Sequence, residues 1–326
     1  MTGAVTGVAE AAAPVPIQAR LAESLRHIDE ALDLPEGPET DLASVARHLD
    51  AGGALEPQAY GHYYALIRAL QGERPEGAMA HIRVLAASPR DPDAGVTIRL
   101  LGPGDFTRPG MRAAKANFTS ESLRPEQLRP IPPAAALRVR RALRRAMDII
   151  RDHAPDSWSD FSRITTEIIA ASGAMRDGMT FDGCSSLERY GSILVNMRRN
   201  RTPLVLAETL VHESAHSLLF ALSCDDHRVL NPPTERYKSP LRIDPRPLDG
   251  IFHAAFVLAR MHGFLAEVAA NDGAPAPMRD EARKLAVRRR ANFFDGYGVL
   301  VEHARFTETG RALIEDARQR VERAAA

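Results

Sequence analysis

The sequence predicts an α+β fold that is predominantly helical, with a small sheet beside one helix that carries two histidines. Three observations lead to this prediction. Apolar residues recur at helical spacing over most of the 326 residues. Two segments, 164–171 and 190–197, are rich in β-branched and other apolar residues and are strand-like. The helix that follows them contains His212 and His216 and is apolar on its other sides.

The overall composition indicates a protein with a sizeable core and no strong charge. The chain has 42 basic and 42 acidic residues, and this balance gives no support to binding of nucleic acid or of a membrane surface. No segment reaches the roughly 18 apolar residues that a membrane span requires. The 2 cysteines are too few for a disulfide framework, so we expect reduced thiols and a cytoplasmic location.

Differences in composition divide the chain into three stretches. Residues 1–16 are rich in Ala, Val and Pro and lack a basic start, so we predict a disordered tail rather than a signal peptide. Residues 17–125 are predicted to form an N-terminal helical region with four short helical segments and a strand at 96–101. The stretch 102–132 holds several Pro and Gly residues and is the best boundary candidate. Residues 126–326 carry the histidine motif, and we expect them to pack with the first region as one unit.

Helices dominate this second region. A strong helix is predicted at 133–153, and the two strands follow it. The helix with the two histidines begins near Pro203, a residue that suits a first helical turn. An irregular, proline-rich stretch then covers 225–249, and a loop of that length is more often functional than idle. Three more helices are predicted, at 250–270, at 278–306 and from 307 to the C-terminus.

The pattern His212-Glu213-Ser214-Ala215-His216 is one HExxH motif. On a helix its two histidines lie four residues apart and project from the same face, one turn above the other. Two neutral imidazoles at that spacing can share one tetrahedral or octahedral metal ion, and Glu213 then lies beside the open position of that ion. The motif is short, but it falls in a clean apolar helix that directly follows a strand. A metal site is therefore the favoured interpretation.

Two histidines do not complete a metal site, so a third ligand decides its chemistry. Glu267 on a later helix, or with less support Glu235 in the loop, would supply a carboxylate. His253 near the start of the 250–270 helix would supply a third imidazole. His253 and Arg260 share a helix face by their i, i+7 spacing, so a metal ligand and a guanidinium could point into one pocket. Four other side chains are more typical of ordinary packing or surface positions: Cys224, His227, His262 and His303.

Three segments together resemble a known family. They are the HExxH motif with its leucine-rich continuation, the segment 244–257 (Asp-Pro-Arg-Pro-Leu-Asp-Gly-Ile-Phe-His-Ala-Ala-Phe-Val), and the ending 306–311 (Phe-Thr-Glu-Thr-Gly-Arg). In this order and spacing they resemble the HExxH-type 2-oxoglutarate-dependent peptide β-hydroxylases. These enzymes occur in bacterial clusters that make ribosomally synthesised, post-translationally modified peptides (RiPPs). The resemblance covers residues 130–326.

This resemblance implies a dioxygenase, an oxidoreductase that uses Fe(II), 2-oxoglutarate and O2 to hydroxylate a β-carbon in a precursor peptide. It implies that His212 and His216 bind iron, with His253 as the third ligand. It also implies that Arg246 or Arg260 holds the distal carboxylate of 2-oxoglutarate, as a guanidinium can do with two parallel hydrogen bonds. A radical SAM enzyme of the same pathway is an expected partner beside the precursor peptide.

The peptide and the motif glutamate have expected places in such a site. Glu213 would accept a hydrogen bond next to the metal, or bind it weakly, rather than act as a general base. The strand 190–197, if it is a sheet edge, would hold the peptide by β-augmentation. Tyr190, Ser192 and Asn196 of this strand are therefore the predicted substrate-binding residues.

Two other functions remain open from the sequence. The first is a zinc metallopeptidase in which Glu213 is the general base for a zinc-bound water, Glu267 is the third ligand, and Tyr190 or His303 stabilises the oxyanion. A strand followed by a metal-bearing helix, the zincin-like arrangement, is typical of that class. The second is a non-enzymatic peptide-binding protein whose metal site is vestigial. The oxygenase is the favoured prediction.

Overall fold

The computed structural model describes residues 15–32, 34–35, 37–72, 77–91, 94–118, 123–174, 181–198, 201–224, 226–239 and 244–324. Its contacts divide the chain into two compact units, Met1–Gly95 and Val96–Ala326. The boundary expected after residue 125 falls inside the second unit, because the strand that begins at Thr97 pairs with the sheet of that unit. Most of the predicted tail, residues 1–14, lies outside the described residues.

The first unit contains the four predicted helical segments. They are α1 (Pro16–Leu32), α2 (Leu42–Asp50), α3 (Gln58–Gln71) and α4 (Ala78–Ala86). The start of α2 is fixed by Asp41, whose side chain accepts a hydrogen bond from the backbone N–H of Ser44. The apolar faces of these helices are fully buried at Leu25, Leu49, Leu66 and Ile82. This unit is therefore a small helical body with its own core.

The second unit is built on a small mixed sheet. Its strands are β1 (Thr97–Leu100), β2 (Leu128–Arg129), β3 (Glu167–Gly173), β4 (Gly183–Ser185) and β5 (Ser192–Asn196). The order is β1-β3-β5-β4, and β2 pairs with β3. β1, β3 and β5 run parallel, whereas β4 is antiparallel to β5. The two predicted strands are thus confirmed as β3 and β5, but β5 is an inner strand and β4 ends the sheet. The expectation that residues 190–197 form a sheet edge is wrong.

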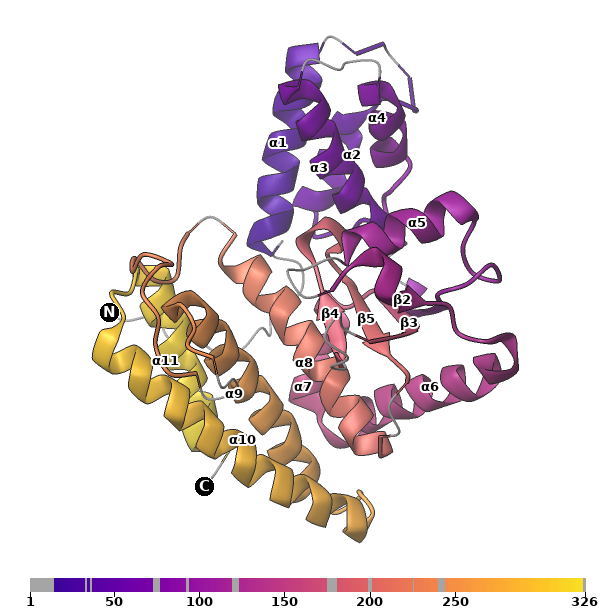
Figure 1. The fold of residues 1–326 in the computed structure, drawn as a ribbon. Coiled ribbons are helices and arrows are strands. Elements are labelled where there is room, and N and C mark those ends of the chain that lie inside the picture. The colour runs from indigo at the N-terminus through magenta and orange to yellow at the C-terminus, as the bar shows by residue number, and fades with distance from the viewer. Residues whose placement is uncertain are drawn as a thin grey trace. The chain divides into compact units, whose positions relative to one another are not determined.

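Helices surround this sheet, and α8 lies between the sheet and the C-terminal helices (Figure 1). Thr202 is the N-cap of α8. Its side chain accepts a hydrogen bond from the backbone N–H of Val205, and Pro203 lies in the first turn. Thr307 caps α11 in the same way. The helices of this unit are α5 (Arg108–Asn117), α6 (Ala136–His153), α7 (Pro155–Ile164), α8 (Pro203–Leu222), α9 (Leu248–Ala270), α10 (Ala276–His303) and α11 (Glu308–Arg323).

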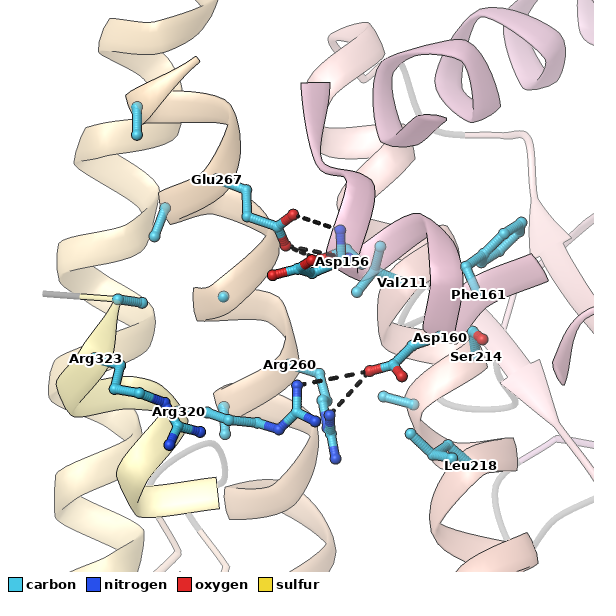
Figure 2. Close-up of a pocket in the computed structure, with 17 residues that line it drawn as sticks. Asp156, Asp160, Phe161, Val211, Ser214, Leu218, Arg260, Glu267, Arg320 and Arg323 are labelled. Atoms are coloured by element: carbon cyan, nitrogen blue, oxygen red, sulfur yellow. Dashed lines mark hydrogen bonds and ion pairs between the residues drawn. The ribbon is translucent and has the colours of Figure 1, made fainter. Parts of the chain in front are cut away.

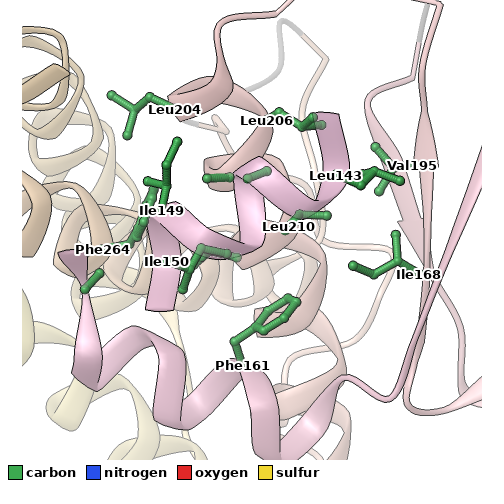
Figure 3. Close-up of a cluster of buried hydrophobic side chains, with 14 of the residues drawn as sticks. Leu143, Ile149, Ile150, Phe161, Ile168, Val195, Leu204, Leu206, Leu210 and Phe264 are labelled. Atoms are coloured by element: carbon green, nitrogen blue, oxygen red, sulfur yellow. The ribbon is translucent and has the colours of Figure 1, made fainter. Parts of the chain in front are cut away.

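The main core of the second unit lies where α6 and α8 meet the sheet (Figure 3). Leu143 of α6, Leu210 of α8 and Phe264 of α9 are fully buried there. Ile168 of β3 and Val195 of β5 complete this cluster from the sheet side. Since β3 and β5 are buried along almost their whole length, their runs of apolar residues match the pattern of strands covered on both faces. The fold is therefore mainly helical α+β, as predicted.

The helix α9 is the most apolar long helix that the structure describes. It alone among the described helices is long and apolar enough to cross a membrane. However, 67% of its apolar window is buried inside the protein. It packs against α8, α10 and α11, so its apolar surface belongs to the core.

Candidate functional site

The two motif histidines converge on one face of α8. Their Nε2 atoms are 3.1 Å apart, and the two rings meet edge to face with centroids 4.8 Å apart. The neighbouring residues Leu210 and Ala215 are buried in the core, so α8 cannot rotate without exposing apolar side chains. This burial fixes the direction in which His212 and His216 project.

The helix α9 brings a third histidine to this pair. The ring of His253 lies 5.5 Å from the ring of His216, centroid to centroid. Two turns further along α9, the sulfur of Met261 lies 3.3 Å from Nδ1 of His212. His212, the earlier histidine of α8, thus meets the later residue of α9, and His216 meets the earlier one, so the two helices are antiparallel. The Nε2 atom of His253 is buried and has no hydrogen-bond partner among the described residues.

Burial makes all three imidazoles poor bases. It lowers the pKa of His212 to about 4, and the guanidinium of Arg289 adds to this effect. It lowers the pKa of His253 to about 4, with Arg228 as the second cause. The pKa of His216 falls well below its ordinary value because of burial and then because of the other two histidines. Near neutral pH the three rings are therefore uncharged, which is the state that can bind a metal ion.

The motif glutamate is held by the edge strand β4. Ser185 donates a hydrogen bond of 2.6 Å to Oε2 of Glu213. At Gly183 a Cβ atom would come within 2.6 Å of the Glu213 side chain, so only glycine leaves room for that carboxyl. Burial raises the pKa of Glu213 to about 7, while the Ser185 hydrogen bond opposes and the charge of Asp182 adds to the rise. A carboxyl of this kind can give or take a proton near neutral pH.

The fit of a metal to these residues is partial. Two nitrogens in adjacent positions on one ion, each at about 2.1 Å, stand roughly 3.0 to 3.4 Å apart, and His212 and His216 match that separation. His253 contacts His216, yet within the described ranges no group of three or more His, Cys, Asp or Glu side chains is arranged to hold a metal ion. The donor chemistry fits a divalent transition metal, and a third bond from His253 requires its side chain to turn.

The two predicted carboxylate-binding arginines each contact a carboxylate of the protein itself. Arg246 makes an ion pair of 2.9 Å with Asp244 through its Nε atom. Arg260 is buried and donates a hydrogen bond of 2.9 Å to Asp160 of α7. Arg260 shares a helix face with His253, but it lies two turns away, about 10 Å along the axis, where α9 faces α7 instead. The expectation that His253 and Arg260 look into one pocket is therefore wrong.

Two other arginines act on the histidines, and the sequence prediction missed both. Arg289 of α10 donates hydrogen bonds of 2.6 and 3.2 Å to the two carboxylate oxygens of Glu208. Glu208 is buried one turn before His212, so it fixes the guanidinium near that ring. Arg228 makes a similar pair with Asp249 and lowers the pKa of His253. The sequence feature that could have indicated a partner such as Arg289 is Glu208, an acidic residue in an apolar helix four residues before His212.

The predicted substrate-binding side chains serve the fold. Ser192 donates a hydrogen bond of 2.6 Å to the buried carboxylate of Glu167. Asn196 donates to two backbone carbonyl oxygens, at 2.9 and 3.0 Å. Tyr190 is buried at 4% exposure. All three residues are buried, and β4, not β5, is the strand beside the histidine motif that ends the sheet.

The alternative third ligands are used elsewhere. Glu267 accepts hydrogen bonds from the backbone N–H groups of Asp156 and Ser157 at the start of α7. It lies about 21 Å along α9 from His253, since fourteen residues separate them. Glu235 accepts hydrogen bonds from Asn231 and Tyr237 in its own loop. His253 is therefore the third candidate ligand that the fold brings closest to the motif.

Comparison with known proteins adds no family to this picture. The chain matches no protein-family model, and no curated protein matches its sequence. The chemistry of the site follows from its own side chains.

Proposed function

We propose that the protein is an Fe(II)- and 2-oxoglutarate-dependent oxygenase that hydroxylates a β-carbon in a ribosomally synthesised precursor peptide. The observation that carries the proposal is the meeting of three uncharged imidazoles, His212, His216 and His253, between α8 and α9. Nitrogen donors without a carboxylate suit Fe(II) as well as Zn(II), so the metal alone does not decide the reaction. The arginines beside the cluster favour an anionic cosubstrate.

The three histidines would hold the metal through ring nitrogens. When bound, iron supplies the activation of O2: one oxygen atom enters the C–H bond of the peptide, and the other enters 2-oxoglutarate as it loses CO2. The protein then has to bind and orient the peptide and 2-oxoglutarate, and to exclude water from the site. Met261 packs against His212 and limits the room beside that ring.

Arg289 is the proposed partner of the cosubstrate carboxylate, in place of Arg246 and Arg260. Its guanidinium is oriented by the buried Glu208 and its side chain remains 25% exposed, so a further anion can reach it. It lies close enough to His212 to lower the pKa of that ring. The distal carboxylate of 2-oxoglutarate bound there would lie on the His212 side of the histidine cluster.

The precursor peptide is proposed to bind along β4. This strand ends the sheet, and an extended peptide can extend a sheet through main-chain hydrogen bonds. Ser185 and Gly183 of β4 touch Glu213, so a peptide on this edge would pass beside the histidines. Glu213, with its raised pKa, can donate or accept a hydrogen bond there according to pH.

An anaerobic titration tests the proposal. Metal-free protein receives Fe(II) and then 2-oxoglutarate while the visible absorbance is followed. A weak charge-transfer band should appear only when both are present. The band should be lost in His253→Ala and reduced in Arg289→Met, and it should persist in His27→Ala, which changes an exposed histidine of the first unit. Absence of the band in the unmodified protein, together with tight stoichiometric zinc binding, would rule out the oxygenase.

One observation favours a second candidate, a zinc metallopeptidase. Glu213 has the pKa of about 7 and the fixed position that a general base requires. The carboxylate ligand expected for this enzyme is missing from the cluster, because Glu267 binds the start of α7. Glu213→Gln separates the two functions: it should abolish peptide hydrolysis almost completely, whereas an oxygenase should keep part of its turnover.

A further inference from the structure

A cavity lies between helices of the second unit. Its volume is about 530 Å³, within the range of small-molecule sites. It is lined by residues of α7, α8, α9 and α11 (Figure 2). None of the three candidate metal ligands lines it. An inference about this cavity therefore does not rest on the proposed function.

One end of the cavity is rich in guanidinium groups. Arg260, Arg320 and Arg323 gather there (Figure 2). Arg260 donates to Asp160 at 2.9 Å, and Arg320 donates to Asp316 at 2.9 Å. The Arg260 side chain is 9% exposed, and its Nε atom has no hydrogen-bond partner in the part of the chain that the structure describes. Arg260 also donates to Asp316 at 3.5 Å, so three guanidinium groups meet two carboxylates here, and the surplus positive charge favours a further carboxylate.

The other end of the cavity is acidic. Asp156 and Glu267 lie there together, apart from the arginines (Figure 2). Glu267 accepts hydrogen bonds of 2.9 and 3.2 Å from the backbone N–H groups of Asp156 and Ser157, so its place is fixed. Asp156 is exposed to solvent. A cationic group entering the cavity would meet two carboxyl groups at this end.

The two ends are separated by an apolar wall. Arg260 and Glu267 are seven residues apart on α9, which corresponds to about 10 Å along the helix axis. The apolar lining consists mainly of small residues of α8 and α9, together with two larger ones: Val211, Ala215, Ala259, Gly263, Ala266, Phe161 and Leu218. Such a wall offers apolar contact to the backbone and side chains of a bound ligand.

We propose that this cavity binds a short zwitterionic peptide of about three residues. Its carboxylate would lie among Arg260, Arg320 and Arg323, and its ammonium group beside Asp156 and Glu267. An extended chain covers about 3.3 to 3.6 Å per residue, so the charged ends of a tripeptide are about 10 Å apart. That length matches the separation of the two ends of the cavity. A single amino acid is too short to reach both, and a peptide with a blocked end lacks one of the two charges.

Titration calorimetry with three forms of trialanine tests this inference. The ligands are free trialanine, N-acetyl-trialanine and trialanine amide, each added to the full chain at pH 7. We expect saturable binding of free trialanine and binding at least about fivefold weaker for each blocked form, because each loses one ion pair. Absence of saturable binding by free trialanine, or equal binding of all three forms, would overturn the proposal.

Two exposed positions assign the ends of the peptide. Arg323→Gln should weaken the binding of free trialanine and bring its affinity close to that of the amide. Asp156→Asn should bring the affinity of free trialanine close to that of the acetylated form. Arg288→Gln and Asp295→Asn change exposed residues outside the cavity and are the matched controls. Binding that is unchanged in both Arg323→Gln and Asp156→Asn would place the peptide elsewhere and refute the assignment of this cavity.

Discussion

The buried carboxyl of Glu213 makes a prediction about stability that needs no substrate. Its pKa rises from 4.5 to about 7 on folding, chiefly because of burial. The folded protein therefore keeps this proton up to about pH 7, whereas the unfolded chain loses it near pH 4.5. It follows that the contribution of Glu213 to stability is fully present below pH 4.5 and is lost as the pH rises through 7. Glu213→Gln removes the titration and keeps a group that can bind Ser185.

The size of the effect follows from the two pKa values. A shift of about 2.5 units corresponds to about 3 kcal/mol between the protonation states. Most of this difference appears between pH 5 and pH 8. Over that range the free energy of unfolding of Glu213→Gln, relative to that of the wild type, should therefore increase by about 2 to 3 kcal/mol. The Glu213 side chain is 5% exposed, so solvent screens it little. The histidines titrate in both proteins and largely cancel in the comparison.

Urea unfolding of the metal-free protein at pH 5, 6.5 and 8 measures this difference. The only tryptophan, Trp158, lies in the second unit and reports unfolding of that unit through its fluorescence. Glu302→Gln is the control, because Glu302 is 74% exposed and its substitution should show little change with pH. A stability difference for Glu213→Gln that is flat across this pH range, or that shrinks as the pH rises, would refute the account of this carboxyl.

Three further predictions concern the fold that carries the site, and urea unfolding measures each of them. Glu167→Ala should cost about 3 to 5 kcal/mol, because it leaves the guanidinium of Arg189 buried at 3% exposure without its partner; a loss under 1 kcal/mol would contradict this role. Phe264→Ala should cost about 3 to 5 kcal/mol through the cavity it leaves in the core, and Phe264→Leu should cost clearly less. Gly310→Ala should destabilise the protein by about 1 to 3 kcal/mol, since its Cβ would collide with the backbone oxygen of Arg228; wild-type stability would show that this contact relaxes freely.

Local patterns in the sequence predicted the parts of the site that lie on single helices. The spacing of His212 and His216 determines that they share a face, and the return of α9 alongside α8 brought His253 to them. These features depend on helical periodicity and on a short chain of neighbouring elements. The mainly helical α+β class followed from the same periodicity.

The features of the site that the sequence analysis missed or predicted wrongly depend on contacts between segments that are distant in the sequence. Arg260 has the right helical spacing to His253, but α7 lies opposite it and supplies Asp160. Arg289 reaches the cluster from α10, and only the partner Glu208 lies near the motif in sequence. The edge strand β4 has three residues in a turn-rich segment, too short for an alternating pattern to reveal it.

The most direct test of the central claim is anomalous diffraction from crystals grown anaerobically with Fe(II), with data collected on both sides of the iron absorption edge. The account predicts one strong peak within about 2.5 Å of ring nitrogens of His212, His216 and His253. Such a peak requires His253 to turn toward the pair, which is a visible change from the present structure. A peak on other ligands, or no peak between α8 and α9 at full iron loading, would contradict the claim that these three histidines form the metal site.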